Sequence, residues 1–154
     1  MSDGRTHTVA TVCVAAGAAI ACIALGQPSA AIYAAGGAIV GVVVHPDLDQ
    51  NSGKSFGAHV LGPLQIPWKI LWAPYAVMVP HRHWMSHAPV VGTTGRVLYL
   101  LVIKAIIHAA IVRVEFWNIL LQDASFILTY PLWLGLIGLA FADLIHYALD
   151  VFPK

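Results

Sequence analysis

Residues 9–26 have the sequence VATVCVAAGAAIACIALG, an apolar run without a charged side chain. At 18 residues, this run is close to the lower limit for a helix that crosses a bilayer. The polar Gln27-Pro28-Ser29 that follows predicts a short turn, and residues 30–44 form a second apolar run rich in Ala and Gly. The two runs together predict a transmembrane helical hairpin.

Gly37 and Gly41 lie four residues apart in the second run. Such a pair of small residues allows two helices to approach closely in a membrane. A helix that is merely rich in Gly and Ala would show the same pattern, so the pair alone predicts no oligomer.

The composition of the whole chain favours lipid as its solvent and partner. Hydrophobic residues make up 59% of the 154 residues and charged residues 10%, and the mean hydropathy is +0.78. A soluble domain carries about 25% charged residues, so this chain has too few to cover a water-facing surface. Its length suits a single membrane domain over residues 1–154. The net charge of +1 and the lack of a basic run give no reason to expect a nucleic-acid partner.

The rest of the chain predicts two further spans, giving an all-α bundle of about four transmembrane helices. The third span is residues 95–112, which include Lys104 and His108, and the fourth is residues 126–149. Residues 60–80 are apolar but contain four prolines, which rule out one regular spanning helix. Because this segment also carries Trp and Tyr, we predict that it is interfacial or re-entrant.

The distribution of positive charge predicts the orientation. With four spans, both termini and the loop of residues 45–94 lie on one side of the membrane. The opposite side carries Arg113 alone. The side of the termini carries most of the basic residues: Arg5, Lys54, Lys69, Arg82 and Lys154, with Arg96 at its border. Since basic loops stay in the cytoplasm, we predict an inner, cytoplasmic-membrane protein with cytoplasmic N- and C-termini.

Three histidines fall within the seven residues HRHWMSH at 81–87. Histidine is the commonest metal ligand in proteins. The predicted topology brings further donors to the same membrane face, from before the first helix, after the second and near the end of the fourth. We therefore predict a metal site at the cytoplasmic interface, with six ligands: His7, Asp47, His81, His87, Asp143 and His146.

The last predicted helix carries a polar stripe. Asp143, His146 and Asp150 follow i, i+3, i+7 spacing, so they share one helix face. An ionisable side chain inside a span costs about 3 kcal/mol and usually faces a partner or water. A bound cation would offset this cost for Asp143 by holding its carboxylate ionised.

Each of these residues taken singly also has a plain structural interpretation. His45, His59 and His83 are typical of histidines that merely lie at a membrane surface, and Asp47 with Asp49 could cap a turn. Lys104 and His108 could form an internal hydrogen-bonded pair. It is the shared membrane side of the six candidates that favours a metal site over these alternatives.

The donor set suggests the metal and its chemistry. Mixed imidazole and carboxylate ligands suit Zn²⁺ best, with Mn²⁺ or Fe²⁺ as alternatives. If one coordination position is open, bound water can be acidified and can attack an ester or phosphoester. Asp49, or another carboxylate that does not bind the metal, could then act as the base, and Arg82 could hold an anionic substrate or intermediate.

Three short motifs carry a family resemblance: Gly4-Arg5-Thr6-His7, Pro46-Asp47-Leu48-Asp49 and the segment from His81 to Pro89. Their order and spacing resemble a family of small integral membrane metal-binding proteins of unknown function. That family is distantly similar to the YdjM-like membrane-bound metal-dependent hydrolases. The resemblance implies that His81 and His87 are ligands and that His83 is a bystander.

A more remote similarity is to the zinc-dependent phospholipase C and single-strand nuclease superfamily, whose sites join an early His, an Asp some forty residues later and a late His/Asp pair. This chain departs from that pattern because His81 falls late and position 112 is Val. The departures favour one or two metals over three.

Three functions therefore follow from the sequence. The first is a metal-dependent hydrolase acting on a lipid or phosphoester at the membrane interface. The second is a non-catalytic subunit or scaffold of a homo-oligomer or membrane complex, with a structural metal site or with no metal. The third is a metal or proton transporter using Lys104, His108 and Asp143, which the lack of a chain of mid-membrane acidic residues disfavours.

Overall fold

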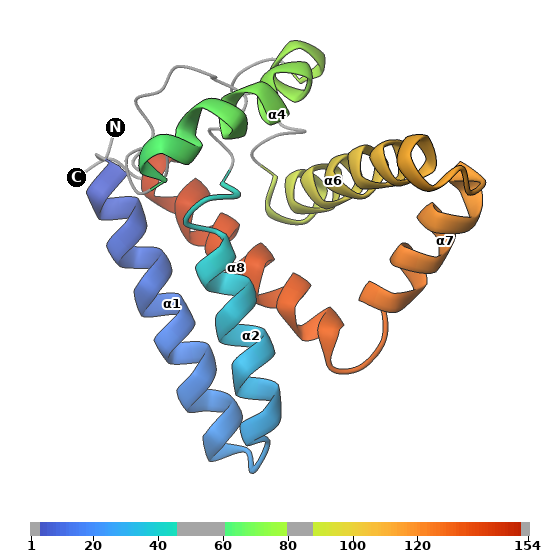
Figure 1. Cartoon of the computed structure of the whole chain (residues 1–154). Coiled ribbons are helices and arrows are strands. Elements are labelled where there is room, and N and C mark those ends of the chain that lie inside the picture. Colours follow the sequence, from blue (N-terminus) through green and yellow to red (C-terminus); the bar gives the residue numbers. More distant parts are fainter. Residues whose placement is uncertain (1–3, 46–60, 80–87, 152–154) are drawn as a thin grey trace.

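The computed structural model describes residues 4–45, 61–79 and 88–151, and these form helices and turns with no strand. The predicted all-α class is therefore confirmed for the described part of the chain. The elements are α1 (Gly4–Ala24), α2 (Pro28–Val40), the short 3-10 helix η2 (Gly62–Leu64), α4 (Gln65–Met78), α6 (Pro89–Val112), α7 (Phe116–Ile127) and α8 (Leu132–Val151). Helices α1, α2 and α8 pack as one bundle, and α6 with α7 forms a separate hairpin (Figure 1).

The predicted hairpin of α1 and α2 is present, and its turn has a clear local cause. Gly26 ends α1 in the left-handed region, with φ of +71°. The N–H of Gln27 donates to the Cys22 carbonyl and that of Gly26 to the Ile23 carbonyl, which together make a Schellman cap. Pro28 then opens α2, where its missing N–H costs no hydrogen bond.

Helices α2 and α8 approach each other so closely that glycine is required at the contact. A Cβ added to Gly37 would lie 1.9 Å from the Gly135 carbonyl oxygen, and one added to Gly138 would lie 2.0 Å from that of Ala34. One added to Gly41 would lie 2.8 Å from the Cβ of Ala142. The close helix contact allowed by Gly37 and Gly41 is therefore made within the chain, against α8.

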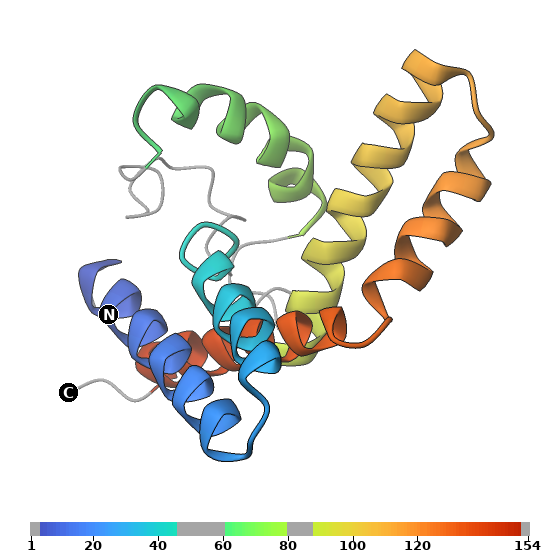
Figure 2. The same cartoon turned by 60° about the horizontal axis from the view of Figure 1, so that its bottom comes forward.

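The α6–α7 hairpin leans away from the bundle (Figure 2). Arg113 ends α6 with a left-handed φ of 57°, which reverses the chain into α7. Lys104 of α6 and Asp123 of α7 form an ion pair of 2.5 Å between Nζ and Oδ1. The hairpin reaches the bundle mainly through contacts between α6 and α8.

Helix α4 packs on α6 through buried aromatic rings. Trp72 and Tyr75 of α4 contact Tyr99 of α6, with ring centroids 5.3 and 5.4 Å from that of Tyr99. The Tyr99 hydroxyl also donates to the Leu71 carbonyl. At 14 residues α4 is too short to cross a bilayer, and its predicted interfacial position stays a prediction.

Three described helices are long and apolar enough to cross a membrane, rather than the four that we predicted: Thr6–Ala24, Pro89–Val112 and Leu132–Val151. The predicted span 30–44 is the 13-residue α2, about 20 Å long, which is shorter than the roughly 30 Å hydrocarbon core. The predicted span 126–149 is interrupted, because α7 ends at Ile127 and α8 begins after Pro131. The predicted span 95–112 is the longer α6.

Candidate metal centre

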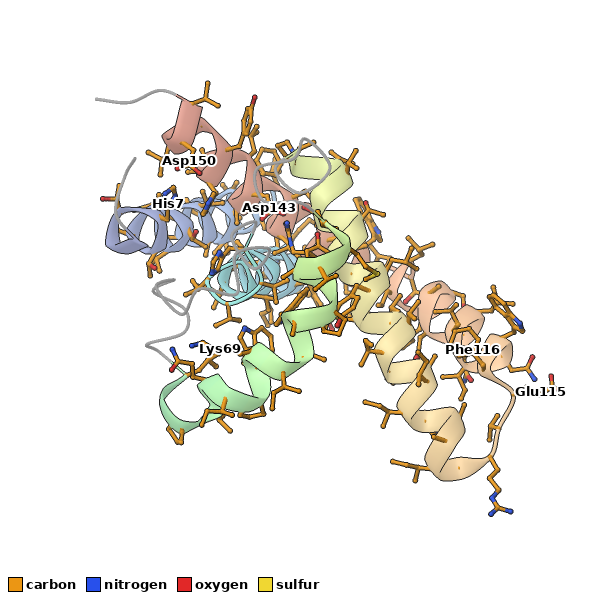
Figure 3. All side chains as sticks on the ribbon, turned by 90° about the horizontal axis from the view of Figure 1, so that it is seen from above. His7, Lys69, Glu115, Phe116, Asp143 and Asp150 are labelled. Atoms are coloured by element: carbon orange, nitrogen blue, oxygen red, sulfur yellow. The ribbon has the colours of Figure 1, made fainter. Side chains whose placement is uncertain are left out.

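The candidate site lies where the start of α1 meets the end of α8. The two helices run antiparallel in the bundle, so the first turns of α1 lie beside the last turns of α8 (Figure 1). His7 projects from α1, and His146 and Asp150 project from α8, where their i, i+4 spacing places them on one face. Figure 3 shows His7 beside Asp150 at this end of the molecule.

The three side chains are close enough to share one ion. The Asp150 carboxylate lies between two imidazoles, with Oδ1 3.4 Å from Nε2 of His7 and Oδ2 3.4 Å from Nε2 of His146. One ligand atom from each residue falls within 4.8 Å of the others. The histidine side chains are 11% and 6% exposed and Asp150 is 27% exposed, so the cluster is sheltered but open on the carboxylate side.

The donor set fits a divalent transition metal. Metal–ligand bonds of about 2.0–2.1 Å in a tetrahedral site place neighbouring donors about 3.3 Å apart. The two histidine–carboxylate distances of 3.4 Å already match that separation. Two imidazoles and one carboxylate would leave the fourth position of such a site for water.

His45 adds a third imidazole next to this cluster. Its ring is nearly parallel to that of His146, with the two centroids 5.9 Å apart. His7 also stacks on His146, with a centroid distance of 3.9 Å. His45 is 8% exposed. The sequence interpretation treated it as a surface histidine, although it directly follows the apolar run that returns to the His7 side.

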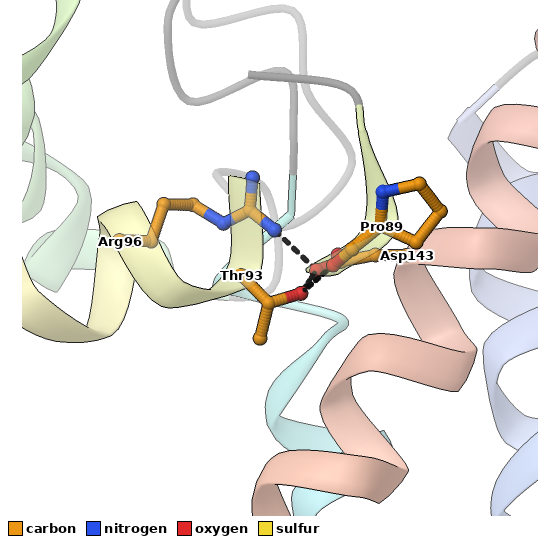
Figure 4. Close-up of polar contacts among 4 residues, drawn as sticks. All are labelled: Pro89, Thr93, Arg96 and Asp143. Carbon is orange, nitrogen blue, oxygen red and sulfur yellow. Dashed lines mark hydrogen bonds and ion pairs between the residues drawn. The ribbon is translucent and has the colours of Figure 1, made fainter. Parts of the chain in front are cut away.

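Asp143 has a different partner from the one predicted. Its carboxylate binds the Arg96 guanidinium and the Thr93 hydroxyl, both from α6, as Figure 4 shows. Arg96 is fully buried and Asp143 is 2% exposed. The cation that offsets the cost of burying Asp143 is therefore Arg96, and the structure places Asp143 outside the three-residue cluster.

The described residues thus bring together two of the six predicted ligands, His7 and His146. Asp150, which the polar stripe contained but which we had not assigned as a ligand, completes the cluster. Asp143, a third predicted ligand, is paired with Arg96 instead. The remaining three predicted ligands and the two predicted catalytic residues lie outside the described residues: Asp47, His81 and His87, with Asp49 and Arg82. Their roles stay predictions.

Lys104 and His108 lie on the α6–α7 hairpin. Lys104 pairs with Asp123, and His108 is exposed on the surface of α6. Among the described residues, no hydrogen bond joins Lys104 to His108 as we had suggested. Asp143 is paired with Arg96. This arrangement gives the transporter hypothesis no support.

A family model described as "Uncharacterized metal-binding protein (DUF2227)" matches residues 2–154. The chain belongs to this family. The match covers nearly the whole sequence, including the residues of the His7 cluster. A search of curated proteins found no match, and neither did a search of solved structures. The predicted family of metal-binding proteins of unknown function is thereby confirmed, whereas the distant YdjM-like relationship stays a prediction.

Proposed function

We propose that this protein is a membrane protein that binds a divalent transition metal, Zn²⁺ foremost, through His7, His146 and Asp150. The observation that carries the proposal is the convergence of these three donors from opposite ends of the chain. Each histidine Nε2 lies 3.4 Å from a carboxylate oxygen of Asp150, and one ligand atom of each residue lies within 4.8 Å of the others. Membership of a metal-binding family supports it independently. Zinc is preferred because it accepts both imidazole and carboxylate with a low coordination number.

We further propose that the metal serves hydrolysis of an ester or phosphoester, of which a membrane lipid is one source. A metal with three protein ligands supplies an acidified water and polarises the bond to be cleaved. In this chain, a substrate would reach the metal from the Asp150 side of the cluster, because Asp150 is the most exposed of the three donors. Arg82 and Asp49 are proposed to hold the anionic group and accept a proton, as predicted from the sequence.

The site is proposed to lie at the cytoplasmic membrane interface. In support, His7 lies at the first turn of the apolar stretch Thr6–Ala24, and Asp150 lies in the last turn of Leu132–Val151. Both spans therefore end at the cluster, where a substrate in the headgroup zone would meet it.

Metal analysis of the detergent-purified protein tests the binding proposal. We expect about one equivalent of zinc in the unsubstituted protein and in His108→Ala, which removes an exposed histidine away from the cluster. We expect less than a third of that in His7→Ala and in Asp150→Asn. Equal metal content in all four proteins would overturn the proposal.

A second candidate function is a structural metal that fastens α1 to α8 without catalysis. The positions of the ligands favour it: His7 lies on α1, whereas His146 and Asp150 lie on α8, so a bound ion would link the two helices. Hydrolysis assays separate the two functions. If p-nitrophenyl phosphate and p-nitrophenyl esters are not cleaved faster by the zinc-loaded protein than by Asp150→Asn, while zinc still raises the melting temperature, the structural function holds.

A further inference from the structure

An apolar groove of about 380 Å³ lies among α6, α7 and α8. Its walls come from all three helices, including Leu98 and Leu101 of α6, Ile127 of α7, and Leu136 and Ala140 of α8. Among the described residues that line it, the polar side chains are Thr93 and Thr94, and no charged group is present. The groove therefore offers no set of polar partners that would hold ordered water.

The surroundings of the groove are also apolar. Leu98 is 51% exposed and Leu128 is 68% exposed, so the groove opens to the outside along α6 and α7. Its walls on α6 and α8 belong to two of the helices that are long and apolar enough to cross a membrane. Other apolar side chains of those two helices are exposed as well, among them Ile107 and Phe141, which are 53% and 55% exposed.

An empty groove in this position would be unfavourable. Side chains that border a void lose the dispersion contacts that a filled space provides. In a membrane, the material at the groove's mouth is hydrocarbon. A flexible chain of methylene groups can follow the space between three helices, and no lining charge opposes it.

We infer that this groove binds one acyl chain of a membrane phospholipid. A phospholipid is the proposed occupant because its acyl chains form the hydrocarbon at the groove's mouth, and the lining carries no cation that would draw in a fatty-acid carboxylate. Its headgroup would stay outside the groove, at the surface of the helices. The inference rests on the proposed membrane location of the protein but not on the metal site, since Leu136 and Ala140 precede Asp143 along α8 and the metal cluster follows it.

Fluorescence quenching by a brominated lipid tests the inference on the full chain in detergent. Leu98→Trp places a reporter at the mouth of the groove. Ile107→Trp is the matched control, because Ile107 lies on the same helix with nearly equal exposure but does not line the groove. The signal of the unsubstituted protein is subtracted from both.

With phosphatidylcholine brominated along one acyl chain, we expect quenching at Leu98→Trp that saturates near one equivalent. The loss of tryptophan fluorescence should be roughly twofold larger than at Ile107→Trp, because an acyl chain bound in the groove stays closer to its reporter than lipid that merely surrounds the helices. Adding Ala140→Phe to Leu98→Trp should remove this difference by filling the groove. Circular dichroism and an unchanged melting temperature establish that the variant is folded, and Leu136→Phe replaces it if it is not.

Two outcomes would overturn the inference. Equal, non-saturating quenching at both reporters would mean that lipid merely surrounds the helices. Quenching by a brominated fatty acid but not by the brominated phospholipid would mean that the groove binds a different ligand. Neither outcome would bear on metal binding, which is measured separately.

Discussion

His7 and His146 stack face to face, with ring centroids 3.9 Å apart and planes inclined by 24°. They lie near opposite ends of the sequence, on α1 and α8. Asp150 lies within 3.4 Å of both rings and supplies the negative charge that a divalent ion requires.

Replacing Asp150 with Asn should weaken zinc binding strongly while leaving the fold intact. The loss should exceed the roughly 10–100-fold typical of residues that only support a ligand, because Asp150 supplies a ligand atom itself. Competition with a chelating dye measures the affinity. Asp123→Asn is the matched control, since Asp123 pairs with Lys104 away from the cluster, and an equal loss in both variants would contradict the assignment.

Zinc should raise the thermal stability of the unsubstituted protein. A ligand at 100 times its dissociation constant stabilises the folded state by about 2.7 kcal/mol, which should move the melting temperature by several degrees. A chelator should reverse the shift. His7→Ala should show no zinc-dependent shift, and a shift of unchanged size in that variant would place the ion elsewhere.

Removing one member of the buried Arg96–Asp143 pair should be strongly destabilising. Asp143→Asn removes the carboxylate charge beside the fully buried guanidinium of Arg96, and breaking a buried ion pair in this way typically costs about 3–5 kcal/mol. Denaturation of the detergent-solubilised protein measures the free energy of unfolding. The double variant Arg96→Met/Asp143→Leu should recover much of the loss, because it removes both charges.

An undiminished loss in that double variant would contradict the interpretation. It would show that packing at the crossing of α6 and α8, rather than the unpaired charge, dominates the effect.

Alanine at Gly37 or Gly138 should force α2 and α8 apart. The added Cβ would overlap a backbone carbonyl oxygen, which a side-chain movement cannot relieve, and overpacking of this kind costs about 1–3 kcal/mol. Gly36→Ala is a control at the neighbouring position, where an added Cβ meets no atom within 4 Å. Its effect should be neutral or slightly stabilising, because alanine favours the helix. Equal melting temperatures in all three variants would show that the helices are less closely packed.

The sequence was most informative where a local pattern has one physical outcome. The charge-free run of residues 9–26 with Gln27-Pro28 after it leads to a helix, a turn and a second helix. The antiparallel return of the chain then brings His7 and His146 to one end, since the chain enters the bundle at His7 and leaves it past His146. Hydropathy alone did not reveal the break at residues 128–131, because those residues lie between two apolar stretches.

What the sequence determined by itself is the helical class, the apolar character of the spans and the family, together with two histidines of the candidate site. Only the tertiary structure decided which carboxylate accompanies them. Asp143 and Asp150 share one stripe on α8, but α6 crosses that stripe beside Asp143 and brings Arg96 to it. Asp150 lies seven residues, or about two helical turns, further along α8, where α1 brings His7 beside it. The roles of the two carboxylates differ because different helices pack against them, and no pattern within α8 contains that information.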